Sequence, residues 1–351
     1  MRVPSYAPLD DALDRLSGYG TELVNGNFNH APMVAEALCA MGRPQAVMPW
    51  IERYQARLVA RAPAGKPVPA AEWRGALGNR DRFPAWSALL AAELRDHAWR
   101  EVLDRWAGRL APAISAAATH GVIRTGHAVR ALMADETPQR VAELADALAS
   151  WAASYRELPT AGGLGNGVLP PREAIARVAI VPPERRRPGN IVAALKGLDD
   201  FAEFAPSIGL VDLDGDIDRS IAELTELFAR VYLSNARNGL TAIVFIHGVT
   251  SLAALGHIAP HVSEPTARLL VRYGWQAGCG LYACFGSGTA WAGEVAAGSQ
   301  SLPESLVDRA LAHGDEHVIK FTEACLCRDA LAPSPAYSAA VANVLEMVGR
   351  R

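Results

Sequence analysis

Apolar residues recur every three or four positions through most of the chain, which is the spacing of one face of an α-helix. Strong helix formers such as alanine, leucine, arginine and glutamate fill these stretches. The pattern predicts helices over residues 8–18, 30–42, 46–61, 84–107, 112–134, 138–155, 217–236, 239–257, 264–284, 303–313, 315–328 and 335–349. Runs with the character of a strand, such as 176–181 and 208–213, are few and short. The sequence therefore predicts an all-α protein.

One stretch departs from the helical pattern. Residues 159–189 are rich in glycine and proline, and they mark the one candidate boundary between an N-terminal and a C-terminal helical half. Histidines that suggest a shared site lie on both sides of this stretch. We therefore expect a single helical domain over residues 1–351, in which 159–189 at most connects two lobes around a central site.

Composition and charge narrow the range of partners. The chain of 351 residues is half apolar, so it can bury a large core, and its net charge of −3 gives no reason to expect a nucleic acid or an anionic membrane as a partner. The start lacks the pattern of a signal peptide, and apolar runs such as 240–246 are too short to span a bilayer. We expect a cytoplasmic protein that acts on a small molecule. A homodimer is compatible with these features, which do not set the oligomeric state.

The cysteines give no sign of a disulfide framework. Their number is odd, and they lie in helical stretches rich in alanine. Cys325 and Cys327 could in principle hold a soft metal, but residues two apart on a helix point about 200° apart. We expect buried free thiols at the five positions, Cys39, Cys279, Cys284, Cys325 and Cys327.

Two short motifs match ligand-binding loops only in part. "GGLGNG" at 162–167 has the glycine spacing of a dinucleotide-binding turn, but no apolar strand precedes it. "DLDGDID" at 212–218 has alternating acidic residues like a calcium loop, but its glycine comes too early and no glutamate closes the loop. We interpret the second motif as a helix start with Asp216 as the N-cap.

"HGDEH" at 313–317 matches the H-x-x-E-H pattern of inverted zinc peptidases. Those enzymes need both histidines one turn apart on one continuous helix. Gly314 followed by Asp315 instead has the form of a helix stop and an N-cap. We therefore expect His313 and His317 on different helices, although the peptidase interpretation stays open at this point.

Four of the nine histidines lie in segments that are otherwise apolar or small: His30, His120, His247 and His317. A buried imidazole without a partner costs roughly 1–3 kcal/mol, so four on separate inward-facing helices need a common explanation. A metal ion provides one. The charged or helix-end surroundings of the other histidines, apart from that in the second motif below, suggest ordinary roles for His97, His257, His261 and His313.

Lys320 would lie on the same helix face as His317 if a helix begins near Asp315. In one interpretation the lysine extends its tip to solvent, and spacing alone favours this. In the other, burial lowers the pKa of the amine, which reacts with carbon dioxide to form a carbamate. The carbamate would then be the anionic ligand that a set of histidines lacks.

Imidazoles with one carboxylate-type oxygen suit iron(II), with manganese and zinc as alternatives. Four imidazoles and a carbamate would leave one position of an octahedral ion open for O₂.

Four segments in this order and spacing resemble the questin oxidase-like family: "NFNHAPMVAEALCAMG" from residue 27, "HGVIRTGHAVRAL" from 120, "FIHGVTSLAAL" from 245 and "DEHVIKFTEAC" from 315. The resemblance spans about residues 20 to 330. Members include fungal enzymes that oxidatively open anthraquinone rings in polyketide pathways. The resemblance implies an α-helical fold with a mononuclear non-haem iron centre. By position its ligands would be four histidines and a carboxylated lysine, namely His30, His120, His247, His317 and Lys320.

The second segment departs from the fungal form, which has another histidine where this chain has Arg124 and an aromatic residue where it has His127. We interpret His127 as a pocket-lining proton donor or, equally, as a core residue. Arg124 would bind a phenolate or carboxylate of the substrate. Four aromatic residues are further candidates for the pocket wall, although we expect them to serve packing: Trp275, Tyr282, Phe285 and Trp291.

Together these features predict an O₂-dependent oxidoreductase that hydroxylates or cleaves an aromatic or quinone-like ring. Two alternatives remain at the level of sequence. One is a helical scaffold or ligand-binding protein without a metal, and the other is a zinc-dependent hydrolase.

Overall fold

A computed structural model describes residues 2–63, 65–161, 167–291 and 302–349. Its helices, in chain order, are α1 (Leu9–Leu16), α2 (Ala31–Ala40), α3 (Val47–Tyr54), α4 (Trp73–Ala76), α5 (Phe83–Asp96), α6 (Trp99–Leu110), α7 (His120–Ala134), α8 (Pro138–Ala153), α9 (Pro171–Ala176), α10 (Ile191–Lys196), α11 (Ile217–Asn235), α12 (Gly239–Ile258), α13 (Glu264–Phe285), α14 (Glu304–His313), α15 (Glu316–Leu331) and α16 (Pro335–Met347). In the described residues the only sheet pairs β1 (Tyr19–Leu23) with β2 (Leu58–Ala60) in antiparallel fashion. The all-α fold class is confirmed.

Four helices from distant parts of the chain form a closed circle. α2 packs on α7, α7 packs on α12, α12 packs on α15, and α15 packs back on α2. The glycines of α7 permit this close approach, because a Cβ at Gly126 would lie 2.6 Å from the Cβ of Ala254 on α12. A Cβ at Gly121 would likewise meet Trp151 of α8 at 2.7 Å. The circle brings parts of the chain as far apart as residues 30 and 320 to one place.

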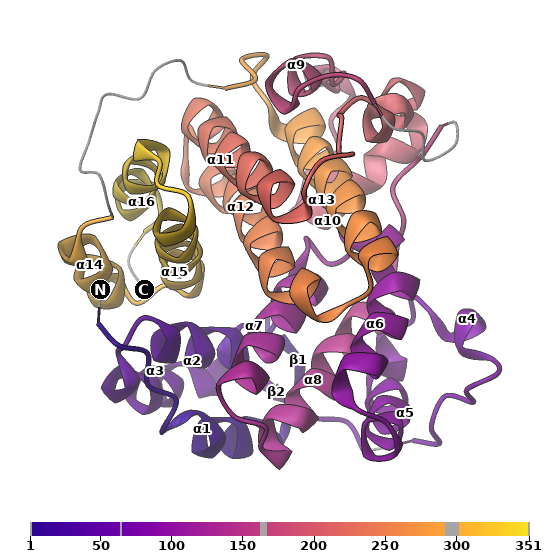
Figure 1. The fold of residues 1–351 in the computed structure, drawn as a ribbon, viewed down its shortest axis with the longest axis vertical. Helices are drawn as coiled ribbons and strands as arrows, with labels where there is room; N and C mark the ends of the chain where they lie inside the picture. The colour runs from indigo at the N-terminus through magenta and orange to yellow at the C-terminus, as the bar shows by residue number, and fades with distance from the viewer. Residues whose placement is uncertain (1, 64, 162–166, 292–301, 350–351) are drawn as a thin grey trace.

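α12 lies at the centre of the fold and contacts α7, α11, α13 and α15 (Figure 1). By length and composition, residues 239–261 could cross a membrane, so the expectation that every apolar run is too short was wrong. However, 83% of the most apolar window is buried inside the protein, as in the core helix of a water-soluble protein. The length of this helix is therefore explained by its neighbours in the fold.

Three predicted helices end or begin elsewhere than expected. The stretch 84–107 is two helices, because His97 and Ala98 are extended between α5 and α6. The stretch 46–61 ends as a helix at Tyr54, and residues 58–60 pair with β1 instead. The stretch 112–134 becomes an α-helix only at His120, because the three residues before it have left-handed backbone conformations.

The segment 159–189 packs against α13 where it is described. Gln276 donates a hydrogen bond to the carbonyl of Pro159, and the amide of Val181 donates to the carbonyl of Ala283. Residues 162–166 of the glycine-rich motif lie outside the described residues. The interpretation of the acidic motif is confirmed, because Asp216 caps α11 by accepting a 2.8 Å hydrogen bond from the amide of Arg219.

Candidate metal centre

The circle of helices brings four imidazoles together. His30 is the N-cap of α2, His120 is the first residue of α7, His247 lies within α12, and His317 lies in the first turn of α15. The centroid of the His30 ring lies 4.6 Å from that of His120 and 4.5 Å from that of His317. The centroid of the His247 ring lies 4.9 Å from that of His120 and 5.7 Å from that of His317. Four residues that are far apart in sequence therefore surround one point.

The spacing of the nitrogens fits a single ion. One ring nitrogen from each of His30, His120 and His317 lies within 4.8 Å of the others, and Nε2 of His247 lies 3.5 Å from Nε2 of His120. Nitrogens about 2.1 Å from one ion would lie within about 4.2 Å of each other, so only small movements are needed. The arrangement has the dimensions of a metal site.

Backbone carbonyls orient two of the rings. Nδ1 of His120 lies 2.5 Å from the oxygen of Ala117, and Nδ1 of His247 lies 2.5 Å from the oxygen of Ile243. Because a carbonyl only accepts hydrogen bonds, Nδ1 must carry the proton in each ring. Nε2 of both residues then keeps its lone pair and points to the cluster, as in histidine ligands whose second nitrogen is held by the protein.

The other two rings each keep a buried nitrogen without a hydrogen bond. Nδ1 of His30 and Nδ1 of His317 have no hydrogen-bond partner among the described residues. Asp315 Oδ1 lies 3.3 Å from the latter but accepts from the helix amides of His317 and Val318. An unpartnered buried nitrogen is costly in a core and expected in a metal ligand. The residues present fit a metal ion.

Three imidazoles of the cluster are kept neutral, which is the protonation state that binds metals. Burial lowers the pKa of His30 and His120 well below the usual range, and lowers that of His247 to about 3. The charges of neighbouring imidazoles and of Lys320 act in the same direction. These three imidazoles are therefore neutral at pH 7, as ligation requires.

Lys320 is buried, with 3% of its surface exposed, so the interpretation that its tip reaches solvent was wrong. Among the described residues its amine makes one hydrogen-bond contact, at 3.8 Å to the sulfur of Met33 on α2. Burial lowers the pKa of Lys320 to about 8, although Glu316 and Asp315 oppose this shift. An amine in this position is partly neutral near pH 8 and can act as a nucleophile.

A cavity of about 600 Å³ is lined by all four histidines. Its walls are largely apolar, with Ala153, Ile191, Leu240 and Ile243 among them, and Phe28 stacks on the ring of His120 at a centroid distance of 4.8 Å. A cavity of this size with aromatic and aliphatic walls suits a multi-ring organic molecule.

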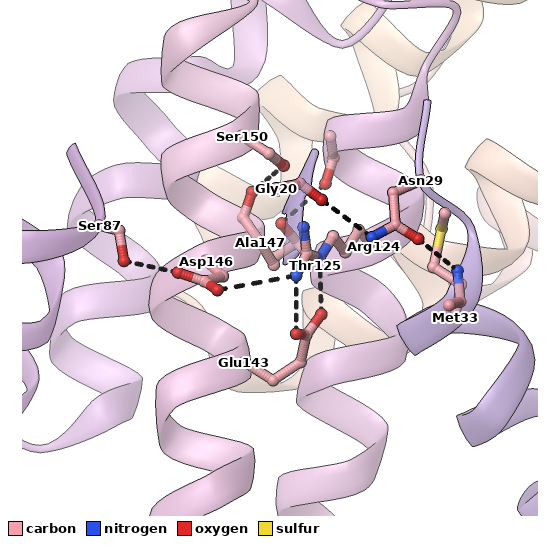
Figure 2. A network of polar contacts seen from close by, with 12 residues as sticks. Gly20, Asn29, Met33, Ser87, Arg124, Thr125, Glu143, Asp146, Ala147 and Ser150 are labelled. Carbon is pink, nitrogen blue, oxygen red and sulfur yellow. Dashed lines mark hydrogen bonds and ion pairs between the residues drawn. The ribbon is translucent and has the colours of Figure 1, made fainter. Parts of the chain in front are cut away.

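The structure does not bring Arg124 to this cavity. Arg124 is not among the residues that line it, and Figure 2 shows its guanidinium facing Glu143 and Asp146, which belong to α8. The guanidinium donates to Glu143 at 2.6 and 2.8 Å, and Asp146 lies 4.0 Å away. Asp146 is in turn bound by Ser87 of α5 and by Arg61. The position of Arg124 contradicts the expected contact with a substrate. Its charge is already neutralised by a carboxylate that lies 19 residues further along the chain.

His127 also lies away from the main cavity, which contradicts its expected place in the cavity wall. Its Nδ1 donates to Glu36 at 2.6 Å, and Glu36 is also bound by Arg130. Burial alone would raise the pKa of Glu36, but the charge and hydrogen bonds of Arg130 together with those of His127 keep this pKa below its usual range. His127 shares a small pocket behind the cluster with Lys320.

The remaining predictions concern residues outside this centre. His313 and His317 lie on different helices, separated by Gly314 in the left-handed conformation, so the requirement for one continuous peptidase helix is not met. None of the four aromatic candidates lines the main cavity. Trp275, for example, is fully buried and donates to the carbonyl of Ser207.

All five cysteines are free thiols. The thiol of Cys327 approaches His257 and Glu323 closely enough for a metal site. However, the guanidinium of Arg130 donates to Glu323 and lies 3.2 Å from Nε2 of His257. Because a cation already lies among these groups, a second cation would be repelled.

No curated protein matches the chain in a sequence search. The model of the questin oxidase-like family, in contrast, matches residues 28–325, which is most of the chain and includes all four clustered histidines and Lys320. The match indicates an oxidase- or oxygenase-type enzyme that acts on small aromatic molecules of the polyketide kind. The chain belongs to the questin oxidase-like family.

Proposed function

We propose that the four histidines and a carboxylated Lys320 hold one iron(II) ion, and that the chain is an O₂-dependent oxygenase. Its substrate would be an aromatic or quinone-like molecule in the main cavity, which is hydroxylated or opened at one ring. The observation that carries the proposal is the convergence of four imidazoles, with neighbouring ring centroids 4.5 to 5.7 Å apart, on the wall of a cavity of about 600 Å³.

The buried lysine supports the carboxylated form. The nearest acidic residues are already engaged, because Asp315 caps α15 and Glu316 forms an ion pair with Arg57 at 3.1 Å. A neutral amine of Lys320 would attack the carbon of CO₂, a C–N bond would form, and one proton would leave to water. The resulting carbamate would provide the oxygen ligand and offset the positive charge of the ion.

Bound iron(II) would supply the reactivity toward O₂. The chain's own residues would do the rest. Phe28, which stacks on His120, would orient a flat ring of the substrate next to this histidine. The aliphatic walls would exclude water from the reacting groups, which strengthens polar interactions inside the cavity. The carbonyls of Ala117 and Ile243 would keep the imidazoles in the ligand tautomer.

Elemental analysis tests the proposal. After anaerobic iron loading, the wild type should hold about one iron per chain, and His247→Ala and His317→Ala should each lose most of it. His97→Ala is the matched control, because His97 is exposed between α5 and α6 and should leave the iron content unchanged. Unchanged iron in both cluster variants would disprove the ligand assignment. Activity with zinc and not with iron would favour a hydrolase instead.

A further inference from the structure

A side chamber of about 180 Å³ adjoins the main cavity. The two share four lining residues, Arg80, Ala117, Ser154 and Val192, so a molecule in the main cavity can extend a substituent past them. Ala117 ties the side chamber to the histidine cluster, because its carbonyl oxygen lies 2.5 Å from Nδ1 of His120. The side chamber therefore lies next to the site where the chemistry is proposed.

The charged residues that line the side chamber are all positive. Within the described part of the chain, its charged lining residues are Arg80 and Arg156 alone. Each arginine has one carboxylate partner, Glu22 at 3.3 Å for Arg80 and Asp199 for Arg156, and neither carboxylate lines the side chamber. A guanidinium has five N–H donors, so each arginine keeps donors for a second acceptor.

The backbone around the side chamber is fixed in place. The amide of Gly78 donates to the carbonyl of Ala152 at 3.0 Å, which anchors the loop that carries Arg80 to the end of α8. The hydroxyl of Ser154 donates to the carbonyl of Ser150, one turn earlier. Two arginines held on anchored backbone are suited to a planar anion, because a guanidinium matches the two oxygens of a carboxylate.

We propose that the substrate is an aromatic acid whose ring system lies in the main cavity and whose carboxylate lies in the side chamber between Arg80 and Arg156. This inference rests on the proposed function only in taking the main cavity as the substrate site. It identifies both arginines as specificity-determining residues, which select a charged substrate over a neutral one of the same shape.

Binding to the metal-free protein tests the inference apart from the iron centre. Anthraquinone-2-carboxylate and anthraquinone-2-carboxamide would be titrated separately, with calorimetry as the readout. The acid should bind about tenfold more tightly, as one charge-assisted pair gives. Arg80→Gln and Arg156→Gln should each remove most of this preference and change the affinity for the amide by less than about twofold.

Arg187→Gln is the matched control, because Arg187 pairs with Asp200 and lines neither chamber. It should keep the full preference for the acid. Thermal unfolding would confirm that every variant is folded. Equal binding of acid and amide to the wild type, an equal loss of both in the arginine variants, or no saturable binding of the acid would overturn the inference. Iron loading that succeeds alongside any of these results would leave the proposed function intact.

Discussion

Single backbone groups control the histidine cluster. The oxygen of Ala117 orients His120, and it belongs to a run of three residues, Ala117 to Thr119, whose φ angles of 48°, 55° and 65° are unusual for residues other than glycine. Such conformations cost on the order of 1 kcal/mol each and persist where surrounding packing enforces them. The strain lies directly beside the proposed ligand, which is where a fixed carbonyl is useful.

Ala117→Gly should separate stability from metal binding. Glycine adopts a φ of 48° without cost, so the free energy of unfolding should stay unchanged or rise by up to about 1 kcal/mol. The freed turn should hold His120 less firmly, and iron affinity should fall. Urea denaturation and metal titration measure the two effects. Ala116→Gly, at a position without a positive φ, should instead lose about 0.5–1 kcal/mol. Equal effects of both variants on stability would show that the turn is unstrained.

The metal-free chain should lose stability in acid. The folded state keeps His247 neutral down to about pH 3, and the pKa of His30 and His120 is lowered in the same direction. Unfolded histidines titrate near pH 6.5, so the unfolded state binds more protons below that pH. The free energy of unfolding should be highest above about pH 6.5 and fall toward pH 3, by up to about 1.4 kcal/mol per pH unit for each imidazole. Urea denaturation across this range checks it, and His247→Asn should have a shallower dependence.

The N-terminus of helix α15 positions one of the proposed ligands, His317. Asp315 caps α15 by accepting from the amides of His317 and Val318, which fixes the first turn and the histidine in it. Asp315→Ala should lower the free energy of unfolding by about 1 kcal/mol and weaken iron binding. Asp315→Asn should largely preserve both, because asparagine is an equally good N-cap. If both variants bind iron as the wild type does, the cap does not position His317.

The contact between α7 and α12 sets the distance between His120 and His247. Gly126→Ala would bring a methyl group within 2.6 Å of Ala254, which should separate the two helices, cost about 1–3 kcal/mol of stability and lower iron affinity. Gly75→Ala is the control, since a Cβ there meets no atom within 4 Å. A Gly126→Ala protein with full stability and affinity would show that this spacing is not tightly set.

Most helices could be predicted from their apolar periodicity. The points at which a helix is interrupted by contacts with distant residues could not. Residues 58–60 carry a helical pattern yet pair with β1, a partner some 40 residues earlier. The clustered histidines could be identified because each is polar within an apolar segment. The positions of Arg124 and His127 could not, since they depend on Glu143 and Glu36 on neighbouring helices.

The residues that line the main cavity could not be predicted from the sequence either. α10 contributes Ile191 and Val192, yet it is a single short helix that follows the segment 159–189, and nothing in its own pattern marks it as part of a site. Phe28 had one usable signal, its place two residues before His30. Side chains that define a cavity are brought together by packing, so their spacing along the chain carries little information.

For the whole molecule, an ion bound by four helices should stabilise all of them together. Iron loading should raise the midpoint of thermal unfolding, because a ligand that binds only the folded state adds RT ln(1 + [L]/Kd), about 2.7 kcal/mol at a hundredfold excess over Kd. Calorimetry of the loaded and chelated protein measures this shift. One cooperative transition would also support the single domain, whereas two transitions with only one sensitive to iron would contradict it.

The circle of helices also has a consequence for biosynthesis. His30 emerges from the ribosome 287 residues before His317, and α15 is the last element to join the circle. A nascent chain thus exposes the earlier imidazoles long before the final one arrives, and it cannot enclose an ion in the meantime. If the circle holds iron as proposed, the ion would be enclosed only after α15 has been translated and has packed against α2 and α12.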